Sequence, residues 1–531
     1  MMLDYRKEEF SPQNLQYDVC IVGAGPAGIG LALSLASSNL NIILIESGGE
    51  IQDAETQNLA SGKNLGLDYF PLAATRLRNL GGSSAHWSGW CAPLDPYDME
   101  DKEWIKDSGW PIQYSELLKH YPQAQKLLGL GPYNYQFESF EDHFTGHPKL
   151  DQNKLTLGMF HFSDPPVNVW NEHKKQLLEQ QNLTIVSYAN ATQINLNPNG
   201  DVVQSITLNS VNGNTDTVES KVFILACGGI ENPRLMLASN SVLSKGVGNG
   251  NDLVGRFFME HIEAECGRLT EFDGALMQRL KKSRNESSNT IGTIFSTTEN
   301  YQKSSKIGNG ALFFDAPRFE DQGTGWSALL DLRDRVSGQP TTYTIAESLK
   351  LILSDFDTAV GVATLRAMGK EVSTRISSKG TLEFVSLSEQ TPNPDSRVTL
   401  SDTLDKFGHP LANLDWQINE LDRKTIRETA LALSVELLRT RIGKLQISEW
   451  LRDEEFSGWP EDLHGGYHHM GTTRMSADHR TGIVDTNCKV HNVENLYVSG
   501  SSVFPTGGYA NPTLTIMALT VRLGEYLQTK L

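Results

Sequence analysis

A glycine-rich segment near the start of the chain has the residue types and spacing of a dinucleotide-binding turn. Gly23, Gly25 and Gly28 follow a short apolar stretch and open a run of small residues. Glycines at this spacing permit a tight turn and let the backbone approach a pyrophosphate, which the N-terminus of the next helix attracts. Glu46 lies about 20 residues further on, where an acidic side chain can hold a ribose diol. A turn that binds nothing is the alternative, but this full context favours a dinucleotide site.

Three histidines, His464, His468 and His469, lie close together near the C-terminus. A neutral imidazole can accept a proton from a hydroxyl group near neutral pH, so His468 is a candidate general base. The residues alone favour a simpler interpretation, in which His468 is a hydrogen-bonded loop histidine. A metal site is a third interpretation, but Gly465 and Gly466 interrupt any helix that would align His464 with His468, and no carboxylate completes the set.

Short apolar strand patterns precede the residues that could bind a dinucleotide. One runs directly into the glycine turn and a second ends at Glu46, which is the beginning of a βαβ unit. A third leads into Ala226 and a fourth into Gly500 and Ser501, so each strand enters a turn of small residues. We therefore predict one dinucleotide-binding domain assembled from distant segments. The strands are Tyr17–Val22, Asn41–Ile45, Lys221–Leu225 and Asn495–Val498, and an apolar helix, Leu514–Leu527, follows the last.

The middle of the chain has a different pattern, typical of antiparallel strands and one long amphipathic helix. Residues Glu420–Arg441 carry apolar side chains at helical spacing. The polar stretch Glu271–Ala346 predicts loops that cover a substrate pocket. Alternating or β-branched strand patterns occur at Thr381–Ser388, Ser396–Leu400 and Ala412–Ile418.

Composition and charge limit the class of protein. The 531 residues, 39% of them hydrophobic, are typical of a globular chain long enough for two or three domains. The net charge of −18 argues against nucleic-acid binding, which requires clustered Lys and Arg, and weakly favours neutral or cationic substrates. The five cysteines are scattered without a CxxC pair, so they indicate neither a disulfide framework nor a zinc site.

The N-terminal residues lack the apolar core of a signal peptide, and no run of about 18 apolar residues occurs in the chain. We therefore expect a soluble, cytoplasmic protein without a membrane segment. An exported protein whose signal has been removed is the alternative.

Several separated motifs together resemble a known family, the glucose-methanol-choline (GMC) oxidoreductases. They occur in the family's order, so the resemblance extends over nearly the whole chain. His86-Trp87 and the sequence ANPTLT at Ala510–Thr515 resemble the pyranose oxidase and sugar (glycoside) dehydrogenase branch. The other motifs are GAGPAG at Gly23–Gly28, LGGSSAHWSG at Leu80–Gly89, GGIENPR at Gly228–Arg234, VGRFFMEH at Val254–His261, PNPDSRVTLS at Pro392–Ser401 and YHHMGTTRM at Tyr467–Met475.

The resemblance implies roles for two residues near the C-terminus. The family's base histidine falls three residues before a Gly-Thr pair, a spacing that His468 reproduces with Gly471 and Thr472. The family places His or Asn opposite this base, and the chain supplies Asn511, whose amide can donate to an alcohol oxygen but accepts a proton poorly. We therefore expect His468 and Asn511 to be catalytic. A turn residue before Pro512 that caps the last helix is the alternative for Asn511, and both roles are compatible.

The resemblance also implies that the dinucleotide is FAD. His86 aligns with the histidine to which pyranose oxidases attach the flavin, whereas other members hold it noncovalently, and both arrangements are open for this chain. Ser88 matches a hydroxyl residue near flavin N5 in those oxidases. The residues expected to bind FAD are Gly23, Gly25, Gly28, Glu46, Gly82, Ser83, His86, Ser88, Ala226, Gly500 and Ser501.

The expected fold is α/β (α+β overall). A Rossmann-like FAD-binding domain is assembled from the discontinuous segments 1–100, 171–265 and 460–531. Residues 101–170 and 266–459 form a substrate-binding domain with an antiparallel sheet and helices.

The predicted reaction is the FAD-dependent oxidation of an alcohol group on a sugar or glycoside to a ketone or aldehyde. Hydride passes to flavin N5, and the electrons pass on to dioxygen, a quinone or a cytochrome subunit. An amino sugar would suit the acidic charge. Two alternatives keep the fold: a flavin-containing lyase of the same family, and the flavin subunit of a membrane-associated sugar dehydrogenase complex.

Overall fold

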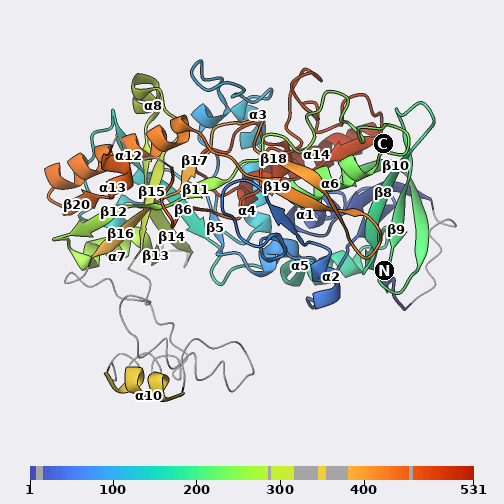
Figure 1. The fold of residues 1–531 in the computed structure, drawn as a ribbon, viewed down its shortest axis with the longest axis horizontal. Coiled ribbons are helices and arrows are strands. Elements are labelled where there is room, and N and C mark those ends of the chain that lie inside the picture. Colours follow the sequence, from blue (N-terminus) through green and yellow to red (C-terminus); the bar gives the residue numbers. More distant parts are fainter. Residues whose placement is uncertain (8–15, 285–288, 316–344, 355–380, 454–457) are drawn as a thin grey trace.

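A largely parallel sheet forms the end of the molecule where both chain termini lie (Figure 1). The computed structural model describes residues 1–7, 16–284, 289–315, 345–354, 381–453 and 458–531. Strand β10 changes partners along its length, because its first half pairs with β9 in an antiparallel ribbon and its second half joins the parallel strands. The parallel strands are β1 (Met2–Asp4), β7 (Leu183–Ser187), β3 (Ile42–Ile45), β2 (Tyr17–Val22), β10 (Thr215–Leu225) and β22 (Leu496–Val498), and β9 (Val203–Asn209) and β8 (Asn190–Leu196) complete the sheet.

The register of this sheet brings three distant segments side by side. Val19 of β2 pairs with Ile42 of β3 and with Val222 of β10. Phe223 of β10 in turn pairs with Leu496 of β22. These residues are buried, which explains the continuous apolar runs of the strands. Because the strands point the same way, the turns that follow them meet at one edge of the sheet, where ligands bind in open α/β sheets.

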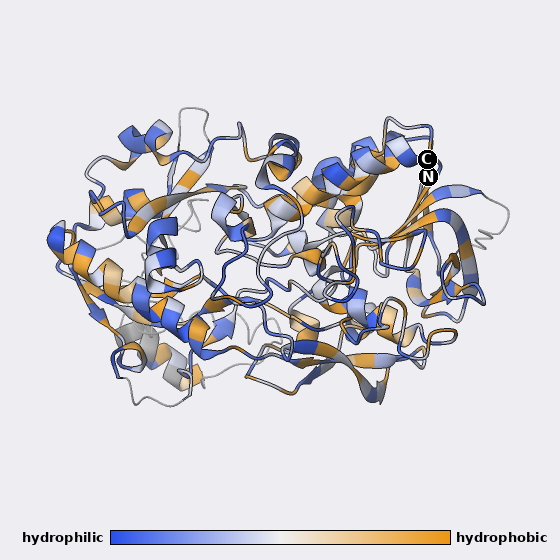
Figure 2. Ribbon diagram, turned by 90° about the horizontal axis from the view of Figure 1, so that it is seen from above, coloured by the Kyte–Doolittle hydropathy of each residue, from blue (hydrophilic) through white to orange (hydrophobic). Residues whose placement is uncertain are grey.

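Helix α1 (Pro26–Ser34) leaves the glycine turn and packs against the last helix of the chain, α14 (Thr513–Lys530). Pro26 begins α1, where its missing N–H costs nothing. Gly30 allows the close approach of the two helices, because a Cβ there would lie 2.9 Å from the Met517 side chain. In Figure 2, hydrophobic residues gather in the strands and along one side of the outer helices.

An antiparallel sheet lies at the opposite end of the molecule, next to the long helix α12 (Glu420–Arg439) (Figure 1). Asn419 caps α12 by accepting hydrogen bonds from the N–H groups of Leu421 and Asp422. Ile426 and Leu433 are fully buried on the face of α12 that packs on the sheet. In sheet order the strands are β20 (Lys444–Ile447), β12 (Glu265–Thr270), β16 (Leu382–Ser386), β15 (Ala311–Asp315), β14 (Thr290–Thr297), β6 (Leu155–Phe162) and β5 (Trp90–Cys91), and β13 (Ser283–Arg284) pairs with β14.

Smaller sheets lie between these two ends. In one of them β11 is the central strand, so that His261 pairs with Glu389 and Ile262 pairs with Gly465. Another packs on α6 (Gly228–Ala238), the helix that follows β10. The first sheet contains β17 (Ser388–Glu389), β11 (His261–Glu263) and β21 (His464–Gly465), and the second contains β18 (Arg397–Leu404), β19 (Pro410–Asp415) and β4 (Gly62–Asn64).

The described part of the chain contains several further, shorter helices. Among the described residues, no helix combines the length and the apolar character needed to cross a lipid bilayer. These helices are α2 (Ala54–Asn58), α3 (Tyr114–Leu118), α4 (Tyr121–Leu127), α5 (Val169–Glu179), α7 (Gly274–Lys281), α8 (Glu299–Ser305), α10 (Ile345–Ser354) and α13 (Glu449–Arg452).

The predicted fold class is confirmed, including the assembly of the Rossmann-like sheet from distant segments. The expectation of loops over Glu271–Ala346 is wrong for the described residues 274–284 and 289–315, which contain α7, β13, β14, α8 and β15. Strand β14 is buried along its whole length because β6 and β15 flank it, a tertiary pairing that its Thr, Ser and Gly content conceals. Residues 316–344 lie outside the described residues. The domain boundaries stay a prediction, and β5, within residues 1–100, pairs with β6.

Candidate active site

A cavity of about 500 Å³ opens where the turns after the parallel strands meet. Its wall combines segments from both ends of the chain and from the middle. Among the residues expected to bind FAD or to act in catalysis, only Gly28 does not line this cavity. The other expected residues all do: Gly23, Gly25, Glu46, Gly82, Ser83, His86, Ser88, Ala226, His468, Gly500, Ser501 and Asn511.

The glycine turn forms one side of the cavity, and two of its three glycines, Gly23 and Gly28, have no space for a side chain. Gly23 has a φ of +102°, and a Cβ on it would lie 2.6 Å from the carbonyl oxygen of Ala226. Gly28 lies behind the turn in α1, where a Cβ would lie 1.8 Å from the carbonyl oxygen of Gly23. Gly25 occupies the N-cap of α1 without a capping side chain. The bare backbone and the positive end of α1 therefore fit a pyrophosphate.

Glu46 is held beside this turn by backbone donors. The N–H of Ala24 donates to its Oε2 at 2.8 Å, and the N–H of Gly48 donates to its Oε1 at 2.9 Å. Burial raises the pKa of Glu46, and these N–H groups oppose the rise. Because Oε2 keeps a second lone pair, it can also accept a hydrogen bond from a ribose hydroxyl.

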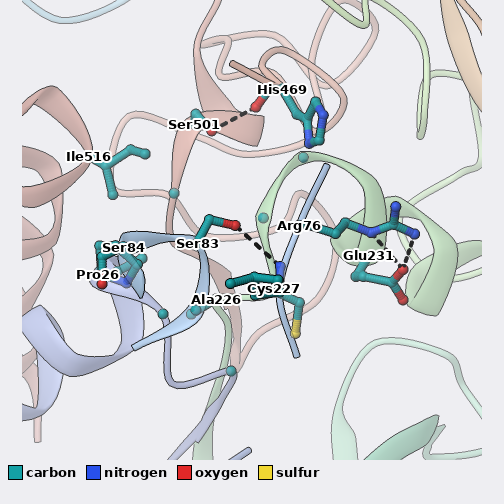
Figure 3. Close-up of a pocket in the computed structure, with 18 of the residues that line it drawn as sticks. Pro26, Arg76, Ser83, Ser84, Ala226, Cys227, Glu231, His469, Ser501 and Ile516 are labelled. Carbon is teal, nitrogen blue, oxygen red and sulfur yellow. Dashed lines mark hydrogen bonds and ion pairs between the residues drawn. The ribbon is translucent and has the colours of Figure 1, made fainter. Parts of the chain in front are cut away.

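The second glycine-rich segment packs directly on the first. Gly82 has a φ of +52°, and a Cβ on it would lie 2.9 Å from the Cα of Gly25. The Ser83 hydroxyl accepts a hydrogen bond from the N–H of Leu77 at 3.4 Å (Figure 3). His86 follows on the cavity wall, and burial lowers the pKa of its ring. A neutral imidazole therefore lines the space that a flavin would occupy.

A charged cluster on the cavity wall was not anticipated from the sequence. Glu231 forms ion pairs with Arg76 at 2.6 Å, with Arg78 at 2.7 Å and with Arg234 at 3.1 Å. Burial alone would raise the pKa of Glu231, but the three positive charges hold it well below its usual value. Figure 3 shows Arg76 and Glu231 directed toward each other. The sequence feature that could have indicated this cluster is the pair Arg76 and Arg78, which lies just before the LGGSS motif.

His469 is fixed in place by neighbours from three parts of the chain. The Ser501 hydroxyl donates to the carbonyl oxygen of His469 at 2.7 Å (Figure 3), and the His469 Nε2 lies 3.0 Å from the Tyr69 hydroxyl. Burial, together with the charge of Arg76, lowers the pKa of His469 to about 3. The ring is therefore neutral and hydrogen-bonded, which agrees with a structural role.

His468 lines the cavity and takes its position from β11. Its N–H donates to the Glu260 Oε2 at 2.7 Å, and its Nδ1 lies 2.8 Å from the Nδ1 of His261. Burial, followed by the neighbouring His261 and His469, lowers the pKa of His468 well below its usual value. A neutral imidazole at this place can accept a proton. The VGRFFMEH motif ends in both Glu260 and His261, but the motif alone gives no contact partner for either.

Glu260 is a fully buried carboxyl group beneath these histidines. It accepts hydrogen bonds from the Tyr69 hydroxyl and from the backbone of His468. Burial raises the pKa of Glu260 to about 8, although both donors oppose the rise. The group is therefore largely protonated in the folded protein at neutral pH.

This raised pKa predicts a pH-dependent contribution to stability that Glu260→Gln removes. Between the unfolded value of 4.5 and the folded value of about 8, the unfolded carboxyl is ionised and the folded one is protonated, so unfolding releases a proton. Glu260 contributes fully to the free energy of unfolding below a pH of 4.5, and this contribution is lost as the pH rises to about 8. We expect the Tm of the wild type to fall relative to that of Glu260→Gln across this window, as measured by thermal unfolding.

The nearby histidines titrate in both proteins, so the difference between the two Tm curves reports on Glu260 alone. Two parallel curves would contradict the raised pKa.

The C-terminal segment brings Gly500 and Asn511 to the cavity. Gly500 has a φ of +123°, a conformation that favours glycine. The N-cap of α14 is Pro512, and the Oδ1 of Asn511 is buried without a hydrogen-bond partner among the described residues. The Asn511 oxygen therefore does not cap α14. An unpaired polar atom on a cavity wall is expected to find its partner in a bound ligand.

Within the described part of the chain, no group of three or more His, Cys, Asp or Glu residues is placed to hold a metal ion. The Nδ1 of His464 instead hydrogen-bonds the carbonyl oxygen of Gly465 at 3.1 Å. The glycine turn and Glu46 give the cavity the geometry of a site for an organic cofactor, and a neutral histidine lies beside it.

Comparisons with known proteins agree with this geometry. Residues 169–263 and 392–520 match the two models of the GMC oxidoreductase family. The 6'''-hydroxyparomomycin C oxidase of Streptomyces lividus is 22% identical, over 97% of this chain and 92% of its own length. The C-glycoside 3-oxidase of Microbacterium trichothecenolyticum is 23% identical, over 96% of each chain. The crystal structure of pyridoxine 4-oxidase from Mesorbium loti has the same fold, with a TM-score of 0.56 and 16% identity over 96% of this chain and 99% of its own.

The matched segments contain much of the cavity wall, namely the lining residues Ala226–Gly229, Gly466–His469, Gly500, Ser501 and Asn511–Thr513. The two models of the GMC oxidoreductase family match this chain in order, around a cavity suited to FAD. The chain therefore contains matches to both the N-terminal and the C-terminal model of that family, and it is an FAD-dependent oxidoreductase that acts on CH–OH donors.

Proposed function

We propose that the enzyme oxidises a hydroxyl group of a sugar or glycoside, amino sugars included, to a ketone or aldehyde. The observation that carries this proposal is the position of His468 and Asn511 on the wall of the cavity that the glycine turn also lines. The similarity to an aminoglycoside oxidase and a C-glycoside 3-oxidase supports a carbohydrate. The net charge of −18 is compatible with a neutral or cationic sugar.

In the proposed reaction, two side chains act on the substrate hydroxyl. FAD, when bound, supplies the hydride acceptor at its N5. His468 takes the hydroxyl proton on the free lone pair of its neutral imidazole. The amide of Asn511 hydrogen-bonds the alcohol oxygen and orients the carbon toward the flavin. Glu46 and the backbone of the glycine turn hold the adenosine end, so the site combines binding and proton transfer in one cavity.

His86 decides how firmly the flavin is held. Its ring lines the cavity beside Ser83 and Ser88, where it can either contact the flavin or be bonded to it. Acid precipitation distinguishes these arrangements, because a bonded flavin stays in the pellet and a noncovalent flavin is released. The variant His86→Ala gives a colourless pellet in both cases and is the reference.

A panel of alcohols mixed with the oxidised enzyme in the absence of oxygen tests the substrate class. We expect amino sugars or glycosides to bleach the visible absorbance of the flavin rapidly, because hydride transfer reduces the ring. Simple aliphatic alcohols should react more slowly, since they lack the ring hydroxyls that position a sugar. Stopped-flow spectroscopy measures both rates.

The reverse order of rates would contradict the carbohydrate proposal. Product formed while the flavin stays oxidised would instead support the lyase alternative, in which only proton transfer operates.

A further inference from the structure

An imidazole pair lies at the end of the cavity, and only one of its members lines the cavity. The Nδ1 of His261 is 2.8 Å from the Nδ1 of His468, and the ring centroids are 4.8 Å apart with an angle of 72° between the planes. His261 is fully buried and His468 is partly buried on the cavity wall. His261 therefore cannot meet a substrate directly but is in contact with the residue that can.

Backbone pairing fixes the two rings relative to each other. Strands β11 and β21 are antiparallel neighbours, and Met259 and Met470 exchange two hydrogen bonds of 3.0 Å on the other side of the pair. His261 and His468 thus belong to segments that are joined both before and after the rings. The contact is a consequence of the fold, since neither side chain has to leave its segment to make it.

The direction of this hydrogen bond decides whether His468 can act as a base. If His468 donates from Nδ1, a neutral ring has its free lone pair on Nε2, which is then available to a substrate hydroxyl. If His261 donates instead, the Nδ1 of His468 is occupied as an acceptor and its Nε2 carries the proton. In that tautomer the neutral ring has no free lone pair for the substrate.

The surroundings of His261 favour the first direction. Its Nε2 is buried beside the backbone of Gly507, where a Cβ would lie 3.7 Å from it, and it has no hydrogen-bond partner among the described residues. Burial lowers the pKa of His261 to about 4, and the carbonyl groups of Gly507 and Gly508 oppose the change by favouring a proton on the ring. A neutral His261 with its proton on Nε2 presents the lone pair of Nδ1 to His468.

We propose that His261 is a positioning residue that accepts a hydrogen bond from the Nδ1 of His468 and so keeps the Nε2 of His468 free as the proton acceptor. The same lone pair stabilises His468 after it has taken the proton, because the Nδ1–H of the imidazolium is a stronger donor. The Nε2 of His261 is buried and has no hydrogen-bond partner among the described residues, so His261 orients the base and does not carry the proton away. This inference rests on the proposed role of His468.

Two substitutions distinguish the role of His261 as a hydrogen-bond acceptor from the effect of its side-chain volume. His261→Asn can place its Oδ1 near the position of Nδ1 and accept the same hydrogen bond, whereas His261→Leu fills the space without an acceptor. We expect His261→Leu to lower the limiting rate of flavin reduction by about 10- to 100-fold, the range for the loss of a group that orients a functional histidine. His261→Asn should retain the rate within a few-fold.

The concentration dependence of the reduction rate separates binding from proton transfer. The substrate Kd should change little in His261→Leu, because His261 does not line the cavity. Flavin content and Tm measured on each variant show whether the fold is intact. His161→Leu is the matched control, since His161 is also buried and contacts the carbonyl groups of Leu130 and Asn134, at 3.2 and 2.8 Å. It should lower Tm without changing the limiting rate.

The double variant His261→Leu/His468→Ala tests the coupling of the two residues. Its reduction rate should equal that of His468→Ala alone, because His261 acts only through His468. Equal limiting rates for wild type, His261→Leu and His261→Asn would overturn the inference, as would equal losses in Leu and Asn variants that retain their flavin. If His468→Ala itself reduces its flavin normally, the proposed base fails first, so the two failures are distinguishable.

Discussion

His468→Ala is expected to slow flavin reduction by about 100- to 10,000-fold, the range for loss of general base catalysis. The hydroxyl proton then has no acceptor as hydride leaves the carbon. The backbone N–H of residue 468, which donates to Glu260 at 2.7 Å, is retained in the variant, so the segment should keep its conformation. Anaerobic stopped-flow mixing with a saturating sugar substrate measures the rate directly.

A nearby histidine provides the control for this substitution. His464 lies in β21, four residues earlier, and its Nδ1 hydrogen-bonds the carbonyl oxygen of Gly465. His464→Ala should therefore reduce its flavin at nearly the wild-type rate. A near-normal rate of flavin reduction in His468→Ala would contradict the assignment of His468 as the base. His469 would then be the next residue to test, because it lines the same cavity.

Gly28→Ala should produce an enzyme that loses FAD. The added Cβ would lie 1.8 Å from the carbonyl oxygen of Gly23, so α1 and the turn would have to separate. Overpacking of this kind costs about 1–3 kcal/mol, and about 1.4 kcal/mol corresponds to a tenfold change in affinity. We expect FAD affinity to fall by about 5- to 150-fold, with a lower Tm. The flavin content after gel filtration and the Tm with added FAD measure these effects.

Gly250→Ala is the matched glycine control. A Cβ on Gly250 would have no neighbour within 4 Å, and its backbone is not in the left-handed region. It should therefore bind FAD like the wild type. An equal loss of flavin in both variants would show that the effect of Gly28→Ala does not come from the turn.

The fold was predictable where one apolar run corresponds to one buried strand. Tyr17–Val22 has the expected bounds, and the strand predicted at Lys221–Leu225 is the parallel end of the longer β10. Strand β14 was missed because its burial comes from β6, more than a hundred residues earlier in the chain, and not from its own hydrophobic pattern. The turns after the parallel strands were found because glycine and serine mark them locally.

The site could be predicted only where a residue's type indicates its role. Gly23, Glu46 and His468 have such types, and all three line the cavity. The contacts of Glu231 and His261 depend on the packing of distant segments, so neither was assigned a role from the sequence. Their partners, Arg76 and His468, lie 155 and 207 positions away.

The C-terminal origin of β22 and α14 has a consequence for how the enzyme matures. Proteins are synthesised from the N-terminus, and domains generally fold as units as they emerge. Here Leu496–Val498 completes the parallel sheet, and α14 packs against α1, the first helix of the chain. A growing polypeptide therefore exposes the apolar surfaces of α1 and β10 until Leu496–Val498 and Thr513–Lys530 have been made. A chain that stops before residue 496 lacks both β22 and α14, so it leaves the edge of β10 and the outer face of α1 uncovered.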